Sequence, residues 1–153
     1  MLYYGFPAVF DNNSRVLILG SFPSIISRDS KFYYGNRNNR FWQVMNECLD
    51  DNIGKSVEDK IKFLLSHNIA LWDIVSSCEI EGSLDSGIRN YTISDLDIIL
   101  SRALIKKILC NGRTAHKLTI RYYGNIGLPI IYLPSTSPAN VRFDIKEWKR
   151  ELR

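Results

Sequence analysis

The apolar run RVLILG at residues 15–20 decides the fold class of this chain. A short stretch of Val, Leu and Ile that ends in glycine is typical of a strand buried on both faces. The runs at residues 69–75 (IALWDIV), 107–110 and 129–133 repeat this pattern. Strands of this kind occur in parallel sheets, because the connecting helices cover both faces of such sheets.

Segments with helical spacing alternate with these runs. The expected helices span residues 39–49, 55–66, 94–103, 113–123 and 144 onward. The third helix is predicted from a capping pattern, Ser94 followed three residues later by Asp97. Residues 76–91 are expected to form a long polar loop. Together these segments predict an α/β protein of three layers, αβα, with a central four-stranded parallel sheet. The length predicts a single domain, residues 1–153.

Composition and charge narrow the classes of function that the chain can have. The net charge of +4 fits a nucleic-acid binder and an ordinary basic protein equally well. Three widely spaced cysteines indicate neither a disulfide framework nor a zinc site, and the two histidines have no second ligand at metal spacing. No stretch approaches the length of a membrane span, and no glycine-rich phosphate loop supports a nucleotide cofactor. We therefore expect a cytoplasmic, monomeric protein without metal or cofactor.

Polar segments follow four predicted strands, near Gly20, Ser76, Asn111 and Pro134. In open α/β sheets ligands bind beyond the carboxyl ends of the strands, so we expect these segments to converge on one site. The first segment, GSFPS at residues 20–24, is either a rigid shelf under a ligand or a plain strand-ending turn. The last, LPSTSPAN at residues 133–140, predicts a stiff loop suited to pressing on a DNA backbone or entering a minor groove.

The stretch FYYGNRNNRFW at residues 32–42 combines three kinds of group. Its tyrosines offer stacking faces, its asparagines offer amides, and its arginines can meet phosphates. Phe41 and Trp42 are expected in the core instead. In the segment at residues 76–90, the carboxylates of Glu79, Glu81 and Asp85 are candidates for acid–base work, although a solvated loop is the commoner explanation.

The motifs GSFPS, YYGNRNNRFW, ALWDIVSSCEIEGSLDS, LCNG and LPSTSPAN resemble the uracil-DNA glycosylase superfamily, and within it the DNA-deoxyinosine (hypoxanthine-DNA) glycosylase branch. They run in the family's order from about residue 16 to residue 140. The resemblance implies a uracil-DNA glycosylase-like fold. It also implies that the chain acts on DNA containing deaminated bases, flipping the base out and hydrolysing its N-glycosidic bond.

The resemblance also implies roles for particular residues. Better-known branches carry Asp or Asn at the third position of the first motif, where this chain has Phe22, which cannot activate water. The branch uses the asparagine before Arg-Phe-Trp, which is Asn39 here. A neutral amide can only orient water and lend its carbonyl dipole. The chain departs from the branch at Asn36, where histidine is common, so the role of Asn36 stays open.

The remaining site residues are expected to hold the base and the DNA. Phe22 and either Tyr33 or Tyr34 would stack on the base, and Asn111 matches the superfamily's base-contacting position. The expected DNA contacts are Arg37, Arg40, Ser135, Thr136, Ser137, Pro138, Ala139 and Asn140. No lysine falls in the matched motifs, which predicts a monofunctional enzyme.

Three alternatives stay open. One is a mismatch glycosylase acting on uracil or thymine opposite guanine, because base choice depends on pocket depth. Another is a non-catalytic module that binds lesions, which Phe22 favours. The third is an enzyme of free nucleosides, against which the stiff loop argues.

Overall fold

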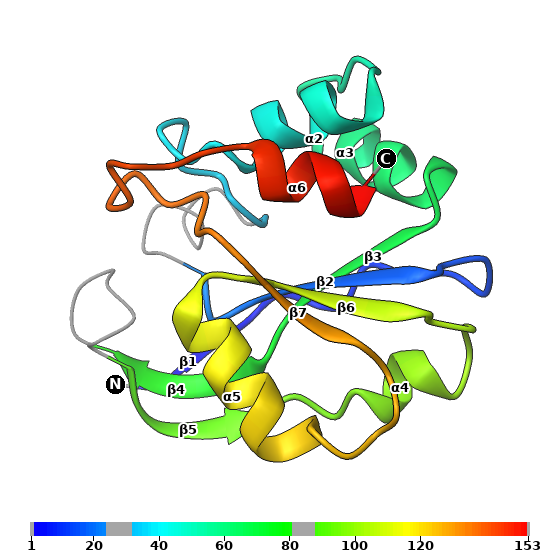
Figure 1. The fold of residues 1–153 in the computed structure, drawn as a ribbon. Coiled ribbons are helices and arrows are strands. Elements are labelled where there is room, and N and C mark those ends of the chain that lie inside the picture. Colours follow the sequence, from blue (N-terminus) through cyan, green and yellow to red (C-terminus); the bar gives the residue numbers. More distant parts are fainter. Residues whose placement is uncertain (1, 24–31, 81–87, 153) are drawn as a thin grey trace.

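The computed structural model describes residues 2–23, 32–80 and 88–152. Its centre is a parallel sheet of four strands in the order β3-β2-β6-β7. These strands are β2 Val16–Gly20, β3 Ile69–Asp73, β6 Lys107–Asn111 and β7 Ile130–Leu133. Helices lie on both faces of the sheet (Figure 1). The predicted α/β class with a four-stranded parallel sheet is therefore confirmed.

The helices fall into two groups (Figure 1). Three of them, α2 Phe41–Leu49, α3 Val57–Ser66 and α6 Lys146–Leu152, lie on one side of the sheet. Helix α5, Arg113–Tyr123, packs on the other side against β6 and β7 and has the predicted bounds. Apolar spacing thus located these helices to within about two residues, the usual uncertainty of helix ends.

A second, antiparallel sheet corrects the loop predicted at residues 76–91. Strands β1 Leu2–Tyr4, β4 Val75–Ile80 and β5 Ile88–Ile93 pair in the order β1-β4-β5. Ile74 alone separates β3 from β4, so the run predicted as one strand at residues 69–75 is divided between two sheets. The prediction was wrong because β4 is held by partners distant in sequence, such as Leu2 opposite Glu79.

The predicted capping pattern at Ser94 is also wrong. The Ser94 hydroxyl donates to the carbonyl oxygen of Asp73 at 2.6 Å instead of capping a helix. Helix α4 spans only Asp97–Leu100, and its N-cap residue Leu96 makes no side-chain cap. Ser94 therefore ties the end of β5 to the end of β3.

The core lies between the sheet and the helices. Its fully buried side chains include Leu17, Ile18 and Leu19 of β2 and Phe41 of α2. Burying a side chain of this size stabilises the fold by about 1.5–3 kcal/mol. Trp148 of α6 is also buried, and its indole N–H donates to the carbonyl oxygen of Pro134 at 2.8 Å. The last helix thereby holds the start of the loop that follows β7.

All three cysteines, Cys48, Cys78 and Cys110, are buried in this core. Burial raises the pKa of the Cys110 thiol to about 11, so this group stays protonated near neutral pH.

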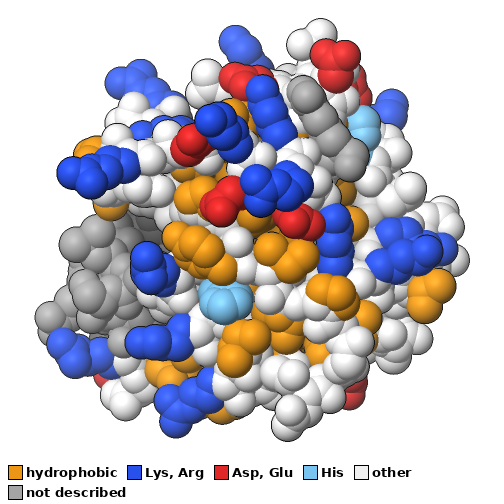
Figure 2. Space-filling view, viewed as in Figure 1, with side chains coloured by type: hydrophobic (Ala, Val, Ile, Leu, Met, Phe, Trp, Pro, Cys, Tyr) orange, Lys and Arg blue, Asp and Glu red, His pale blue; other side chains and the backbone are white. Residues whose placement is uncertain are grey.

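Charged side chains are distributed unevenly over the surface. Figure 2 shows Lys and Arg side chains along the left margin of this face, near the loop that follows β7 and down toward the small sheet. Most of the Asp and Glu side chains visible on this face lie in the upper part of the view, over the helices and among basic ones. The loop side of the molecule is therefore the more basic part of this face.

Candidate active site

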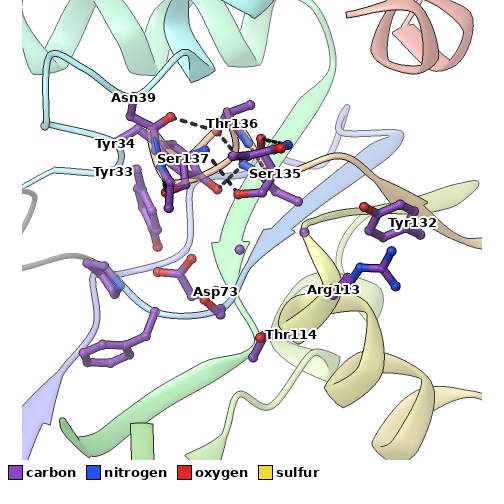
Figure 3. A pocket seen from close by; sticks show the side chains of 18 residues that line it. Tyr33, Tyr34, Asn39, Asp73, Arg113, Thr114, Tyr132, Ser135, Thr136 and Ser137 are labelled. Atoms are coloured by element: carbon purple, nitrogen blue, oxygen red, sulfur yellow. Dashed lines mark hydrogen bonds between the residues drawn. The ribbon is translucent and has the colours of Figure 1, made fainter. Parts of the chain in front are cut away.

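A cavity of about 510 Å³ opens at the carboxyl ends of β2, β3 and β6. The segment before α2 and the loop after β7 complete its walls (Figure 3). The predicted convergence of strand ends is therefore found, with one difference. Strand β3 contributes Asp73 at its carboxyl end, whereas Ser76 lies in β4 and outside the lining. A cavity of this size is within the range of small-ligand sites.

Most of the predicted site residues line this cavity. Those that do are Phe22, Tyr33, Tyr34, Asn39, Asn111, Ser135, Thr136, Ser137, Ala139 and Asn140. Arg37, Arg40 and Pro138 lie outside the lining.

A hydrogen-bonded network joins three of the lining segments (Figure 3). At its centre is Thr136, whose side chain is fully buried. The Thr136 hydroxyl donates to Asn39 Oδ1 at 2.7 Å and accepts from Asn111 Nδ2 at 3.0 Å. Asn111 Nδ2 also donates to the Tyr34 hydroxyl at 3.2 Å. The segment before α2, the end of β6 and the loop after β7 are thus held in one arrangement.

The network decides which way the Asn39 amide faces. Asn39 Oδ1 accepts from the backbone N–H of Phe41 at 3.0 Å and from the Thr136 hydroxyl. A backbone N–H can only donate, so the atom beside it must be the carbonyl oxygen. Both lone pairs of that oxygen are used. The NH2 group of Asn39 makes no hydrogen bond within residues 2–23, 32–80 and 88–152, so it is the group available to a ligand.

Asn111 is engaged in the same way. Its Oδ1 accepts from the Thr136 backbone N–H at 3.0 Å, while both hydrogens of Nδ2 serve Thr136 and Tyr34. Asn111 therefore has a structural role in this network at the end of β6. Its contact with a base stays a prediction, and only the second lone pair of Oδ1 remains for it.

Both tyrosines of the YY pair line the cavity (Figure 3). In extended backbone, neighbouring side chains point to opposite sides, but Tyr34 has a φ of 54°, in the left-handed region. That turn brings the two rings to the same site. The Tyr34 ring stacks on Phe41, with centroids 4.1 Å apart, so one of its faces is already covered.

Tyr33 forms a fixed wall. It is 2% exposed, and its hydroxyl lies 3.0 Å from the carbonyl oxygen of Phe6 and 2.8 Å from that of Pro7. Burial raises the pKa of Tyr33 far above its usual value, and the charge of Asp73 adds to the effect. Tyr33 therefore offers a ring but no acid–base group. Phe41 and Trp42 pack in or against the core, as predicted.

Asp73 is a lining residue that the sequence did not reveal as one. It is the last residue of β3 and only 4% exposed. Within IALWDIV it sits in an apolar run, which was interpreted as continuous core. The available signal was a lone acidic residue inside a strand that is otherwise apolar, because buried carboxylates are rare and concentrate at functional sites.

Comparison with known proteins agrees with this geometry. Residues 7–152 match the sequence profile of the uracil DNA glycosylase superfamily. The chain belongs to this superfamily. A hypoxanthine DNA glycosylase of Methanosarcina acetivorans is 37% identical over 100% of this chain and 99% of its own length. A second protein of that name, from Methanosarcina barkeri, is 32% identical over 71% of this chain and 70% of its own length.

A solved structure has the same superfamily fold. It is the solution NMR structure of a candidate uracil DNA glycosylase from Methanosarcina acetivorans, with a TM-score of 0.89 and 36% identity. The match covers 100% of this chain and 98% of the other.

Phe22, in the first superfamily motif, lines the cavity. Phe22 is 8% exposed, and a Cβ at Gly5 would lie 3.5 Å from its ring. At the motif's first position, a Cβ on Gly20 would lie 2.5 Å from Asp73 Oδ1 and 2.8 Å from the Tyr34 hydroxyl. The glycine therefore leaves room for both groups, which is what a rigid shelf requires.

The loop after β7, residues 134–140, is held by its own side chains and by Arg40, the N-cap residue of α2. Asn140 Nδ2 donates to the Ser135 carbonyl oxygen at 3.0 Å, closing the loop on itself. The Arg40 guanidinium donates to the Ser137 carbonyl oxygen at 2.9 Å and lies over the Phe143 ring. Pro138 and Ala139 are exposed at the tip. Arg40 thus positions the loop, and its contact with DNA stays a prediction.

The other candidates contribute less. Glu79 is exposed, accepts a hydrogen bond from Asn90 and lies outside the cavity, and Ser24, Glu81 and Asp85 lie outside the described residues. Asn36 shapes the turn before Asn39 through its backbone carbonyl oxygen, which accepts a hydrogen bond from the backbone N–H of Asn39 at 2.8 Å. Among residues 2–23, 32–80 and 88–152 no cluster of potential metal ligands occurs, and no helix there has the length and apolarity to cross a membrane.

Proposed function

We propose that this protein is a DNA glycosylase that removes hypoxanthine from deoxyinosine in DNA by hydrolysing the N-glycosidic bond. The observation that carries the proposal is the cavity at the strand ends, lined by aromatic side chains and by the Asn39 amide, whose oxygen is held by two hydrogen-bond donors. The full-length relative named as a hypoxanthine DNA glycosylase supports the choice of base. We propose further that the enzyme acts as a cytoplasmic monomer and without a metal.

The cavity suits a base rotated out of the helix. Extruding a base costs a few kcal/mol, least for a mispaired one, and hypoxanthine pairs poorly with thymine. Phe22, Tyr33 and Tyr34 supply aromatic surface against which the base can stack. Stacking of this kind contributes about 1–3 kcal/mol per base.

The chemistry assigned to Asn39 follows from its orientation. As the bond to the sugar breaks, negative charge builds on the departing purine. N–H groups aimed at that charge bind more tightly in the transition state than in the ground state, which lowers the barrier. Asn39 lines the cavity and its NH2 group is engaged by no described residue, so we assign it donation to the leaving base. This replaces the carbonyl role expected from the sequence.

The reaction should leave an intact strand. The described lining residues include no lysine, so no amine is at hand to form a Schiff base with the opened sugar. The expected product is an abasic site that is cut only after alkali treatment, and a strand break without alkali would contradict a monofunctional enzyme.

A panel of labelled duplexes tests the proposed function. Duplexes carrying inosine, uracil, xanthine or a G·T mismatch are incubated with excess enzyme, treated with alkali and resolved on a gel. We expect the fastest cleavage at inosine. Faster cleavage at uracil or thymine would make this a mismatch glycosylase, and binding of inosine DNA without any product would make it a lesion-binding module. Cleavage of free deoxyinosine as fast as the duplex would indicate a nucleoside enzyme.

A further inference from the structure

Helix α5 carries a row of positive charges that begins at the cavity. Arg113, Lys117 and Arg121 stand four residues apart and are all exposed. Residues at this spacing lie one above another on the same side of a helix. The row therefore extends about 12 Å along α5 from Arg113, which lines the cavity. We call these three residues the α5 stripe.

No negative charge within the helix balances the α5 stripe. The sequence of α5, RTAHKLTIRYY, contains neither Asp nor Glu. None of the three side chains forms an ion pair within residues 2–23, 32–80 and 88–152. Other helices mix the two signs, since α3 begins with Glu58 and Asp59 and Lys149 of α6 pairs with Glu47 of α2. The charge of α5 is thus not compensated by the described part of the chain.

The arrangement is unfavourable for the helix itself. Like charges four residues apart repel each other. Arg113 also places a positive charge at the N-terminal end of α5, where the helix dipole favours a negative one, and only Arg121, in the last turn, suits the dipole. Local costs of this kind are typical of functional surfaces, where a ligand offsets them. A negatively charged ligand would offset these.

Aromatic rings hold both ends of the α5 stripe. The Arg113 guanidinium lies over the Tyr132 ring, 5.6 Å from its centroid, and Figure 3 shows both residues across the cavity from Tyr33. The Arg121 guanidinium lies over the Tyr122 ring at 5.5 Å. A guanidinium stacked on a ring keeps its N–H donors at its edge, where phosphate oxygens can reach them. These arginines are therefore positioned for phosphate without an acidic partner.

We propose that the α5 stripe binds the phosphate backbone of the DNA arm on one side of the flipped nucleotide. The inference rests on the proposed function and assigns a path to the duplex, which that function leaves open. Each DNA strand carries one phosphate per 3.4 Å of helix axis, so the stripe spans about three to four phosphates. Basic side chains continue from the loop side toward the small sheet on the face that shows α5, which agrees with this path (Figures 1 and 2).

The test compares two double variants that lose the same charge. The stripe variant combines Lys117→Ala with Arg121→Ala, and both residues lie outside the cavity lining. The control variant combines Lys62→Ala with Arg102→Ala, two exposed residues in α3 and after α4. Fluorescence anisotropy measures the affinity of each protein for an undamaged labelled duplex between about 50 and 200 mM salt.

The stripe variant should lower the slope of log affinity against log salt by about 1.8, because each phosphate contact contributes about 0.9. The control variant should keep the wild-type slope. Melting temperatures of the stripe variant and the wild type should be close, since exposed helical positions accept alanine well. An unchanged slope in the stripe variant, or an equal fall in both variants, would overturn the inference.

Shortening the duplex on one side of the lesion gives a second readout. Inosine duplexes are cut back on either the 5′ or the 3′ side, and binding is measured in an Asn39→Ala background to slow cleavage. The affinity that the stripe variant loses relative to its parent should vanish on one shortened duplex and persist on the other. An equal loss on both would contradict contact with a single arm.

The salt measurement needs no lesion and no cleavage, so it separates this inference from the proposed function. If inosine is not excised but the slopes differ as expected, the proposed function fails and the α5 stripe still binds DNA. If inosine is excised and the slopes are equal, only the assignment of the α5 stripe fails.

Discussion

At the scale of single residues, the direction of one amide determines the chemistry available to the site. Asn39 could be expected from the sequence as the catalytic asparagine, through its place before Arg-Phe-Trp. Whether it donates or accepts could not, because that depends on Thr136, which lies 97 residues later in the chain. Asp73 was not predicted: the lone acidic residue in an apolar run was the available signal, but the run alone does not show whether that residue faces a core or a cavity.

Substitutions at Asn39 test this orientation. Asn39→Ala should lower single-turnover cleavage of an inosine duplex at least a hundredfold, because removing one donor aimed at developing charge typically costs about 10²–10³ in rate. Asn39→Asp keeps an oxygen beside the Phe41 N–H and the Thr136 hydroxyl but has no N–H to offer, so it should be equally impaired. Asn39→Asp keeps both hydrogen bonds, so its melting temperature should change little, whereas Asn39→Ala loses both and should melt a few degrees lower.

Asn38→Ala is the matched control for these variants. Asn38 is an exposed neighbour outside the cavity, so the same truncation there should leave cleavage within about twofold of wild type. Wild-type cleavage by Asn39→Ala would remove the residue from the mechanism, and full activity in Asn39→Asp would show that an oxygen suffices.

At the scale of elements, the sequence pattern within a segment predicted those helices and strands whose formation depends on that segment alone. The four parallel strands and helix α5 follow from apolar runs and helical spacing that the chain carries within each segment. The small sheet did not follow, because β1, β4 and β5 become strands by pairing with one another over long sequence distances. Ser94 was misassigned for the same reason, since the end of β3 uses its hydroxyl.

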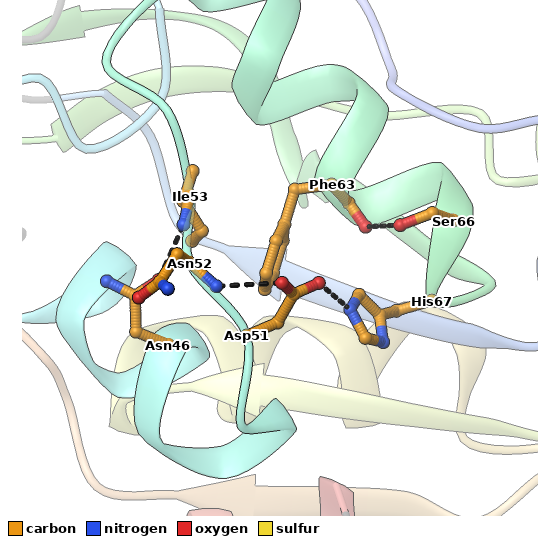
Figure 4. A network of polar contacts seen from close by, with 7 residues as sticks. All are labelled: Asn46, Asp51, Asn52, Ile53, Phe63, Ser66 and His67. Atoms are coloured by element: carbon orange, nitrogen blue, oxygen red, sulfur yellow. Dashed lines mark hydrogen bonds and ion pairs between the residues drawn. The ribbon is translucent and has the colours of Figure 1, made fainter.

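One contact between elements should make stability depend on pH. Asp51, after α2, lies 2.9 Å from the imidazole of His67, which caps the end of α3 (Figure 4). The hydrogen bond from His67 and one from the Asn52 N–H hold the pKa of Asp51 below its usual value of 3.8. A lowered folded-state pKa means that the contact stabilises above the unfolded pKa and is lost as the pH falls through the folded one.

Asp51→Asn should therefore lower the melting temperature slightly at pH 7, and the difference from wild type should shrink as the pH falls below 3.8. Thermal unfolding followed by circular dichroism measures the melting temperatures of both proteins at pH 7 and at low pH. Asp50→Asn removes the same charge one residue earlier, where the left-handed backbone at φ 48° suits asparagine, and should not show this pattern. A difference that grows at low pH would contradict the assigned direction.

At the scale of the whole molecule, basic side chains lie on the side where the cavity opens (Figures 1 and 2). Arg37 is exposed in the segment that leads into α2 and is a predicted phosphate contact. Arg102 is also exposed but follows α4, at the opposite end of the sheet from the cavity (Figure 1). The two arginines carry the same charge but lie at opposite ends of the sheet. Comparing their alanine variants therefore distinguishes the loss of a DNA contact from the loss of net charge.

Arg37→Ala should weaken duplex binding for every sequence and reduce the slope of log affinity against log salt by about 0.9, the value of one phosphate contact. Fluorescence anisotropy of a labelled duplex between about 50 and 200 mM salt measures that slope. Arg102→Ala should leave it unchanged. Equal slopes for the wild type and both variants would remove Arg37 from the DNA contact.

The junction at Ile74 links the two sheets more closely than their separate hydrogen-bond patterns suggest. Asp73, which lines the cavity, ends one strand, and the small sheet begins two residues later. The backbone there is fastened to Gly20 and Ser21 on one side and to Ser94 on the other. A substitution in the small sheet can therefore shift Asp73 without altering any side chain of the cavity. The small sheet is thus a place where evolution can adjust the shape of the cavity while the residues that line it stay the same.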